Sequence, residues 1–64
     1  MEFEIIKTRK TNSGTIILAS LPGNAVTPWA TWWTPEFRGK DSERHYGHYH
    51  PEWAEALNDY ETRF

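Results

Sequence analysis

Residues 44–64, RHYGHYHPEWAEALNDYETRF, join a predicted strand to a predicted helix. The segment 44–50 is rich in aromatic residues and is predicted to be extended, because tyrosine favours strands. Pro51 follows at the expected first helical position, where its missing N–H costs little. Glu52 and Glu55 then lie near the positive end of the helix dipole. A strand that runs directly into a helix predicts a sheet with that helix packed against it.

The predicted helix has one apolar face. Its apolar residues follow the i, i+3, i+4, i+7 and i+11 spacing of a packed stripe, and they are Trp53, Ala56, Leu57, Tyr60 and Phe64. The acidic residues of this region are Glu52, Glu55, Asp59 and Glu61. We expect these carboxylates to form a solvated face, which could also meet a basic groove on a partner.

Three more strands are predicted before this segment. Residues 2–8 alternate apolar and charged side chains, and a turn at 11–14 leads to the β-branched run 15–19, which together predict a hairpin. Residues 27–34 form a third candidate strand. Because prolines 28 and 35 bound it, we expect a short or edge strand. Residues 35–43 are polar and aperiodic, as expected of an exposed loop.

The predicted fold class is therefore α+β: a three- to four-stranded antiparallel sheet with one C-terminal helix packed on one face, in the order β-β-β-β-α. A chain of 64 residues predicts one small domain, 1–64, whose 4 Trp, 3 Tyr and 3 Phe supply most of the burial. The absence of cysteine excludes disulfides and favours a reducing, cytoplasmic location. Charged residues near the start and short apolar runs predict no signal peptide and no membrane association.

Strand alternation assigns side chains to the two faces of the sheet. Trp32 and Trp33 are adjacent and must project to opposite sides, so one of them faces away from the helix. If Trp33 lies under the helix, Trp32 lies on the open face. On strand 44–50, strict alternation places Tyr46, His48 and His50 on one side and His45, Gly47 and Tyr49 on the other. An uncovered aromatic face predicts a binding surface, unless the loop 35–43 folds over it or a second copy dimerises through it.

The histidines raise the question of a metal site. His48 and His50, at i and i+2, could reach one divalent ion with Asp41 or Glu43 as a third ligand. Only two of these ligands come with a defined geometry, so we expect no metal and no cofactor, and ring nitrogens hydrogen-bonded on the sheet. A His–carboxylate pair could also act as an acid–base pair. Since no nucleophile stands in a recognisable pattern, we expect no enzymatic activity.

Single-stranded nucleic-acid binding is an alternative function. Bases could stack on Trp32, Tyr46 or Tyr49, while phosphates follow Lys10, Arg38, Lys40 and Arg44. The net charge of -2 argues against it, because an acidic protein gains little from counterion release. A structural homo-oligomer is a further alternative.

Residues 28–64 resemble a loose group of small, uncharacterised phage- and prophage-encoded proteins. The likeness lies in the Thr-Trp strand at 31–32, the Tyr-Gly-His-Tyr strand at 46–49 and an Ala-x-x-Asp-Tyr-x-x-Arg helix at 56–63. The resemblance implies a compact accessory protein that binds a host protein, as anti-defence inhibitors such as anti-CRISPR proteins do. It carries over no functional residue.

The function predicted from the sequence is non-enzymatic binding of a macromolecular partner, in particular a host protein. Trp, Tyr and Arg are enriched among interface anchors. The predicted contact residues are Trp32, Tyr46, His48 and Tyr49, with Arg38, Lys40 and Arg44 at the rim.

Overall fold

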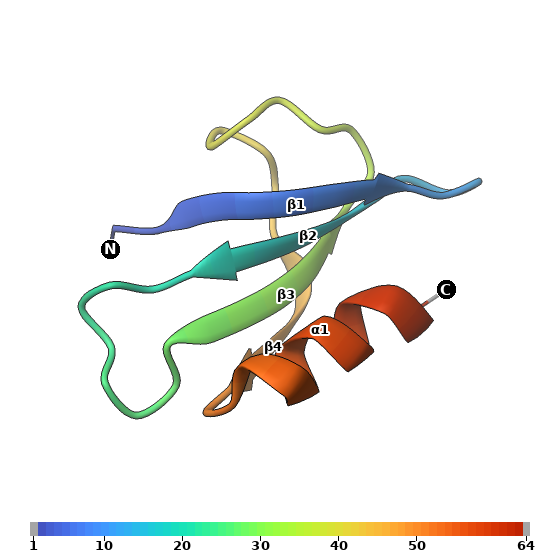
Figure 1. Ribbon diagram of the computed structural model, residues 1–64. Helices are drawn as coiled ribbons and strands as arrows, with labels where there is room; N and C mark the ends of the chain where they lie inside the picture. Colours follow the sequence, from blue (N-terminus) through green and yellow to red (C-terminus); the bar gives the residue numbers. More distant parts are fainter. Residues whose placement is uncertain (1, 64) are drawn as a thin grey trace.

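The computed structural model describes residues 2–63 and contains four strands followed by one helix. The elements are β1 (Glu4–Lys10), β2 (Thr15–Ser20), β3 (Trp29–Thr34), β4 (His45–His50) and α1 (Trp53–Thr62). The strands form one antiparallel sheet in the order β1-β2-β3-β4, and α1 packs on one face of it (Figure 1). The predicted α+β fold is confirmed. Phe64, the last residue of the predicted apolar stripe, lies outside the described residues.

β2 is the centre of the sheet and is buried on both faces. Ile16 and Leu18 face α1, while Ile17 and Ala19 belong to the cluster on the opposite face. A strand covered on both sides needs apolar residues at consecutive positions, as this run of β2 provides. None of the helices within residues 2–63 has the length and apolar character needed to cross a membrane.

β3 corrects one expectation. Prolines 28 and 35 suggested a short or edge strand, and β3 is short, with 6 residues, but it lies between β2 and β4 and not at an edge. Both prolines fall just outside the strand Trp29–Thr34, so neither removes an N–H from the hydrogen-bonded ladder. They mark the ends of a short interior strand.

The β1–β2 turn requires glycine. The Thr11 hydroxyl accepts hydrogen bonds from the backbone N–H groups of Ser13 and Gly14, which fixes the turn. A Cβ atom on Gly14 would lie 2.3 Å from the Thr34 carbonyl oxygen and would also meet the Trp33 ring. Glycine therefore lets this turn pack closely against the end of β3.

α1 begins later than the sequence suggested. Pro51 was expected at the first helical position, but the helix starts at Trp53 and Glu52 is its N-cap residue. Glu52 has extended dihedrals, φ -116 and ψ 139, so the chain uses two residues to turn from β4 into the helix. Glu55 lies in the first turn, as expected from the helix dipole.

The C-terminal end of α1 is stabilised by a side chain from the other end of the protein. The last turn of the helix contains no basic residue. Arg9 of β1 instead donates hydrogen bonds from Nη2 to the carbonyl oxygens of Tyr60 (2.8 Å) and Arg63 (2.6 Å). Terminal carbonyls carry the negative end of the helix dipole, so a guanidinium is favourable there.

The sheet face opposite α1 is covered by aromatic and basic side chains. Phe3 packs edge-on against Trp32, with ring centroids 5.3 Å apart. The Arg44 guanidinium lies 5.4 Å from the Phe3 ring centroid and 5.8 Å from that of Trp32. Lys40 Nζ lies 5.4 Å from the centroid of the Phe3 ring. In Figure 1 the loop between β3 and β4 arches towards the β1 side of the sheet, away from α1.

This cover corrects the prediction for Trp32. The residue lies on the face away from the helix, one of the two assignments that the alternation of β3 left open, but it is only 4% exposed. The alternative in which the loop 35–43 folds over this face is borne out in part, because Lys40 comes from that loop while Phe3 and Arg44 lie outside it. Trp32 belongs to a core cluster and cannot be an exposed contact residue.

Candidate functional site

β4 contains a bulge that places its three histidines on one face. Thr31 pairs with His48 and Trp33 pairs with His45, so two steps along β3 correspond to three along β4. Tyr46, within the bulge, has a φ of 57°. Directly paired residues share a face, so His45 lies on the α1 side with His48 and His50. The predicted separation of His45 from the other two is wrong, because strict alternation ends at the bulge.

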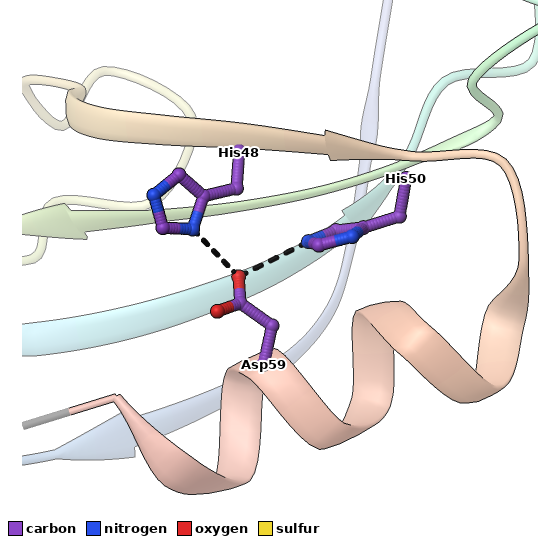
Figure 2. A group of neighbouring side chains, drawn as sticks. All are labelled: His48, His50 and Asp59. Atoms are coloured by element: carbon purple, nitrogen blue, oxygen red, sulfur yellow. Dashed lines mark hydrogen bonds and ion pairs between the residues drawn. The ribbon is translucent and has the colours of Figure 1, made fainter.

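Asp59 of α1 holds His48 and His50 together (Figure 2). Its Oδ2 atom lies 2.9 Å from His48 Nδ1 and 3.0 Å from His50 Nε2. The same oxygen accepts a hydrogen bond from the hydroxyl of Thr31, a buried residue of β3. An ionised carboxylate only accepts hydrogen bonds, so the His48 Nδ1 and His50 Nε2 atoms both carry protons here.

The acidic partner of this histidine pair differs from the predicted ones. Asp41 and Glu43 were the third ligands considered for a metal site that was not expected, but Glu43 contacts His45 (3.2 Å) and Asp41 lies in the β3–β4 loop. Asp59 was expected on the solvated face of the helix, yet it is half-buried. The missed signal is spacing: Asp59 lies three residues after Ala56, at the border of the buried stripe.

The hydrogen bonds around Asp59 control its ionisation. Burial acts to raise the pKa of this carboxyl group, but the hydrogen bonds from Thr31, His48 and His50 outweigh it. The pKa of Asp59 is therefore lowered from its ordinary value of 3.8. The carboxylate stays charged at neutral pH.

Arg63 connects this cluster to the bulge in β4. It is buried, and its Nη1 atom donates to the Thr31 hydroxyl (3.0 Å) while lying 4.0 Å from Asp59 Oδ2. Its Nη2 atom donates to the Tyr46 carbonyl, which supplies a partner for a backbone group in the irregular part of β4. Burial lowers the pKa of Arg63, an effect that the charge of Asp59 opposes. Sequence reasoning missed Arg63, although it lies seven residues after Ala56 on the same side of the helix.

The predicted contact residues divide into four groups. Tyr46 and Tyr49 are 67% and 58% exposed on β4. His48 is exposed but bonded to α1, and Trp32 is buried. The three basic residues of the predicted rim lie in or beside the β3–β4 loop and are Arg38, Lys40 and Arg44.

The basic residues already have partners within the chain. Arg38 forms an exposed ion pair with Glu36 (3.1 Å). Lys40 lies 3.9 Å from Glu4 and Arg44 stacks on the aromatic cover of the open face. Arg44 lines a pocket together with Tyr49.

This pocket opens beside Tyr49 and has a volume of about 270 Å³. Its lining consists of Leu21, Trp32, Arg44, Gly47 and Tyr49. Cofactor and drug-sized sites usually measure about 300–1,000 Å³. The pocket is therefore large enough for one inserted side chain of a partner and too small for most cofactors.

Comparisons with protein-family models, with curated proteins and with solved structures found no match. The candidate sites therefore rest on the contacts within this chain. They are the Asp59-centred cluster under α1 and the tyrosine-rich surface of β4.

Proposed function

We propose that this protein is a non-enzymatic binding protein that recognises a partner protein through the β4 surface, defined as the edge of β4 away from β3, with Tyr46 on its α1 side and Arg44 and Tyr49 on the opposite side. The observation that carries the proposal is the exposure of two tyrosines, at 67% and 58%, on an edge strand. Exposed tyrosines supply large contact area at a low cost in side-chain entropy. Tyr and Arg are also enriched among the residues that dominate binding energy.

The position of β4 supports a protein partner. Among residues 2–63, β4 pairs with β3 alone, so its other edge faces away from the sheet. Edge strands are common sites of recognition by extended peptide segments. The neighbouring pocket offers an apolar base, Leu21 and Trp32, with the Arg44 guanidinium at its side. Such a pocket favours one partner side chain that is flat or acidic.

The nucleic-acid alternative has less support. Its stacking platform included Trp32, which is buried under Phe3 and Arg44. Two of its basic residues, Lys40 and Arg44, pack on aromatic rings instead of forming a free cationic track. The resemblance of residues 28–64 to phage accessory proteins favours a host protein as the partner, and inhibition of a host defence system as the role.

The proposal can be tested by partner capture. Tagged protein is used to retain partners from a bacterial lysate, and the retained protein is identified, purified and titrated against the wild-type chain. We expect the double variant Tyr46→Ala/Tyr49→Ala to bind at least about tenfold more weakly, as for interface anchors. Both side chains are exposed, so the fold should be preserved.

Val26→Ala is the matched control, because Val26 is an exposed apolar residue (78%) outside β4. It should leave the affinity unchanged. Equal binding by the double variant and the wild type would overturn the proposal. So would a wild-type homodimer, detected by light scattering, that the double variant abolishes, because the surface would then serve self-association.

A further inference from the structure

We propose that His48, His50 and Asp59 bind one divalent first-row transition-metal ion, for which Zn²⁺ is the probe. One ligand atom from each residue lies within 4.8 Å of the other two. Two imidazole nitrogens and a carboxylate oxygen form a donor set that suits zinc and its neighbours in the first row. This inference is independent of the proposed partner surface.

The distances are close to those around a shared ion, and a movement of the exposed His48 ring would complete the fit. Zinc is bound by nitrogen and oxygen at about 2.0–2.2 Å, which places neighbouring ligand atoms of a tetrahedron about 3.3–3.6 Å apart. The nitrogen–oxygen distances are 2.9 Å for His48 and 3.0 Å for His50. Each must therefore lengthen by a few tenths of an ångström, while the two ring nitrogens, up to 4.8 Å apart, must approach each other by roughly 1 Å. The ion takes the place of the two protons that now join the rings to the carboxylate, and each neutral ring then carries its proton on its other nitrogen, His48 Nε2 and His50 Nδ1.

The burial of the ligands favours an open coordination site. The His48 side chain is 51% exposed, whereas those of His50 and Asp59 are largely buried. His48 can therefore turn towards an ion without disturbing the core. The ring planes of His48 and His50 are inclined by 86°, and both rings approach Asp59 from β4 (Figure 2). With three protein ligands, water can complete the coordination.

The surroundings of Asp59 hold the carboxylate in position. Thr31 donates a hydrogen bond to Asp59 Oδ2, and Arg63 Nη1 donates to Thr31. Hydrogen-bonded partners of this kind orient the ligands in metal sites. The Arg63 charge, 4.0 Å from Asp59 Oδ2, opposes a second cation. We therefore expect weaker binding than in a closed, four-ligand structural zinc site.

Isothermal titration of the metal-free protein with ZnCl₂ tests the site. The wild type should bind one Zn²⁺ per chain. His48→Ala should weaken binding at least about tenfold, because it removes one of three ligands. His45→Ala is the control, since His45 lies on the same strand and face and also contacts a carboxylate, Glu43. The affinity of His45→Ala for Zn²⁺ should match that of the wild type.

Two further measurements guard against loss of folding in a variant. Circular dichroism checks each variant, and Asp59→Asn serves as a second one because its amide oxygen can still accept the Thr31 hydrogen bond. Zn²⁺ should raise the unfolding midpoint of the wild type and of His45→Ala, and leave that of both ligand variants unchanged. Absence of saturable heat in the wild type, or equal weakening by His45→Ala and His48→Ala, would overturn the proposal.

Discussion

The two faces of the sheet are covered in physically different ways. On the α1 face, the carboxylate of Asp59 accepts hydrogen bonds from β3 and β4, beside an apolar contact made by Ala56 and Tyr60. On the opposite face, Phe3 and Arg44 close over Trp32. A chain of this size therefore covers its second face with individual side chains, and Trp32, which looked available for binding, is part of the core.

The comparison predicts different responses to mutation. On the sheet face opposite α1, the contribution to the free energy of unfolding should depend on the apolar area buried by Trp32, and little on pH. On the α1 face, the contribution to the free energy of unfolding should depend on whether Asp59 is charged. Three variants test these statements.

Trp32→Ala should have the largest effect. Truncating a buried tryptophan costs about 3–5 kcal/mol, which approaches the whole stability expected of a core this small. The variant should be largely unfolded, as measured by circular dichroism and urea unfolding.

Trp53→Ala is the control, because Trp53 is partly exposed and contacts Trp29 at the rim of the helix. Trp53→Ala should lose less than half as much free energy of unfolding as Trp32→Ala. If Trp32→Ala lost no more free energy of unfolding than Trp53→Ala, the side chains on the sheet face opposite α1 would not form a tightly packed core cluster.

Asp59→Asn should have an intermediate effect that depends on pH. Replacing the acceptor of several hydrogen bonds should cost about 1–3 kcal/mol at neutral pH. The pKa of Asp59 is lowered in the folded state. The stability that the charged Asp59 contributes is therefore fully present at pH values above the ordinary carboxyl pKa of 3.8. That contribution is lost as the pH falls from this value through the lower pKa of the folded state.

The measurement is urea unfolding of both proteins between neutral and acid pH, with a chelator present. The difference in free energy of unfolding between wild type and Asp59→Asn should become smaller as the solution becomes acidic. Glu61→Ala, which removes an exposed carboxylate from the same helix, should not narrow it. A difference that stayed constant down to the most acidic sample would mean that the charge of Asp59 does not stabilise the fold.

Arg44→Ala should have the smallest effect. Its guanidinium stacks on Phe3 and Trp32 but is exposed to solvent, so about 0.5–1 kcal/mol is expected. Arg38→Ala, which removes only an exposed ion pair with Glu36, should cost less, and thermal unfolding can compare the two. A larger loss for Arg38→Ala would contradict the assigned role of Arg44.

The sequence was sufficient for the features that depend on local periodicity. The apolar spacing of Ala56, Leu57 and Tyr60 predicted which side of α1 packs, and the adjacent tryptophans 32 and 33 do lie on opposite faces. Turn residues and β-branched runs located the hairpin. These features need only the period of one helix or strand, so they can be inferred without knowing the neighbours.

The parts that sequence reasoning missed depend on contacts between distant segments. The bulge at Tyr46 shifts the alternation by one residue, and nothing in a period-2 pattern reveals such a shift. Asp59 seemed solvated because its partners Thr31 and His48 come from other elements. The exposure of Trp32 was misjudged for the same reason, since its cover comes from Phe3 and Arg44.

The two hydrogen bonds of Arg9 bear on how the chain folds. They join residues 51 and 54 positions apart in the sequence, so they connect the first strand to the end of the only helix within the described residues. Contacts at such separation form only after a large loss of chain entropy. The carbonyl groups at the end of α1 therefore gain these hydrogen bonds only after β1 has folded beside the helix.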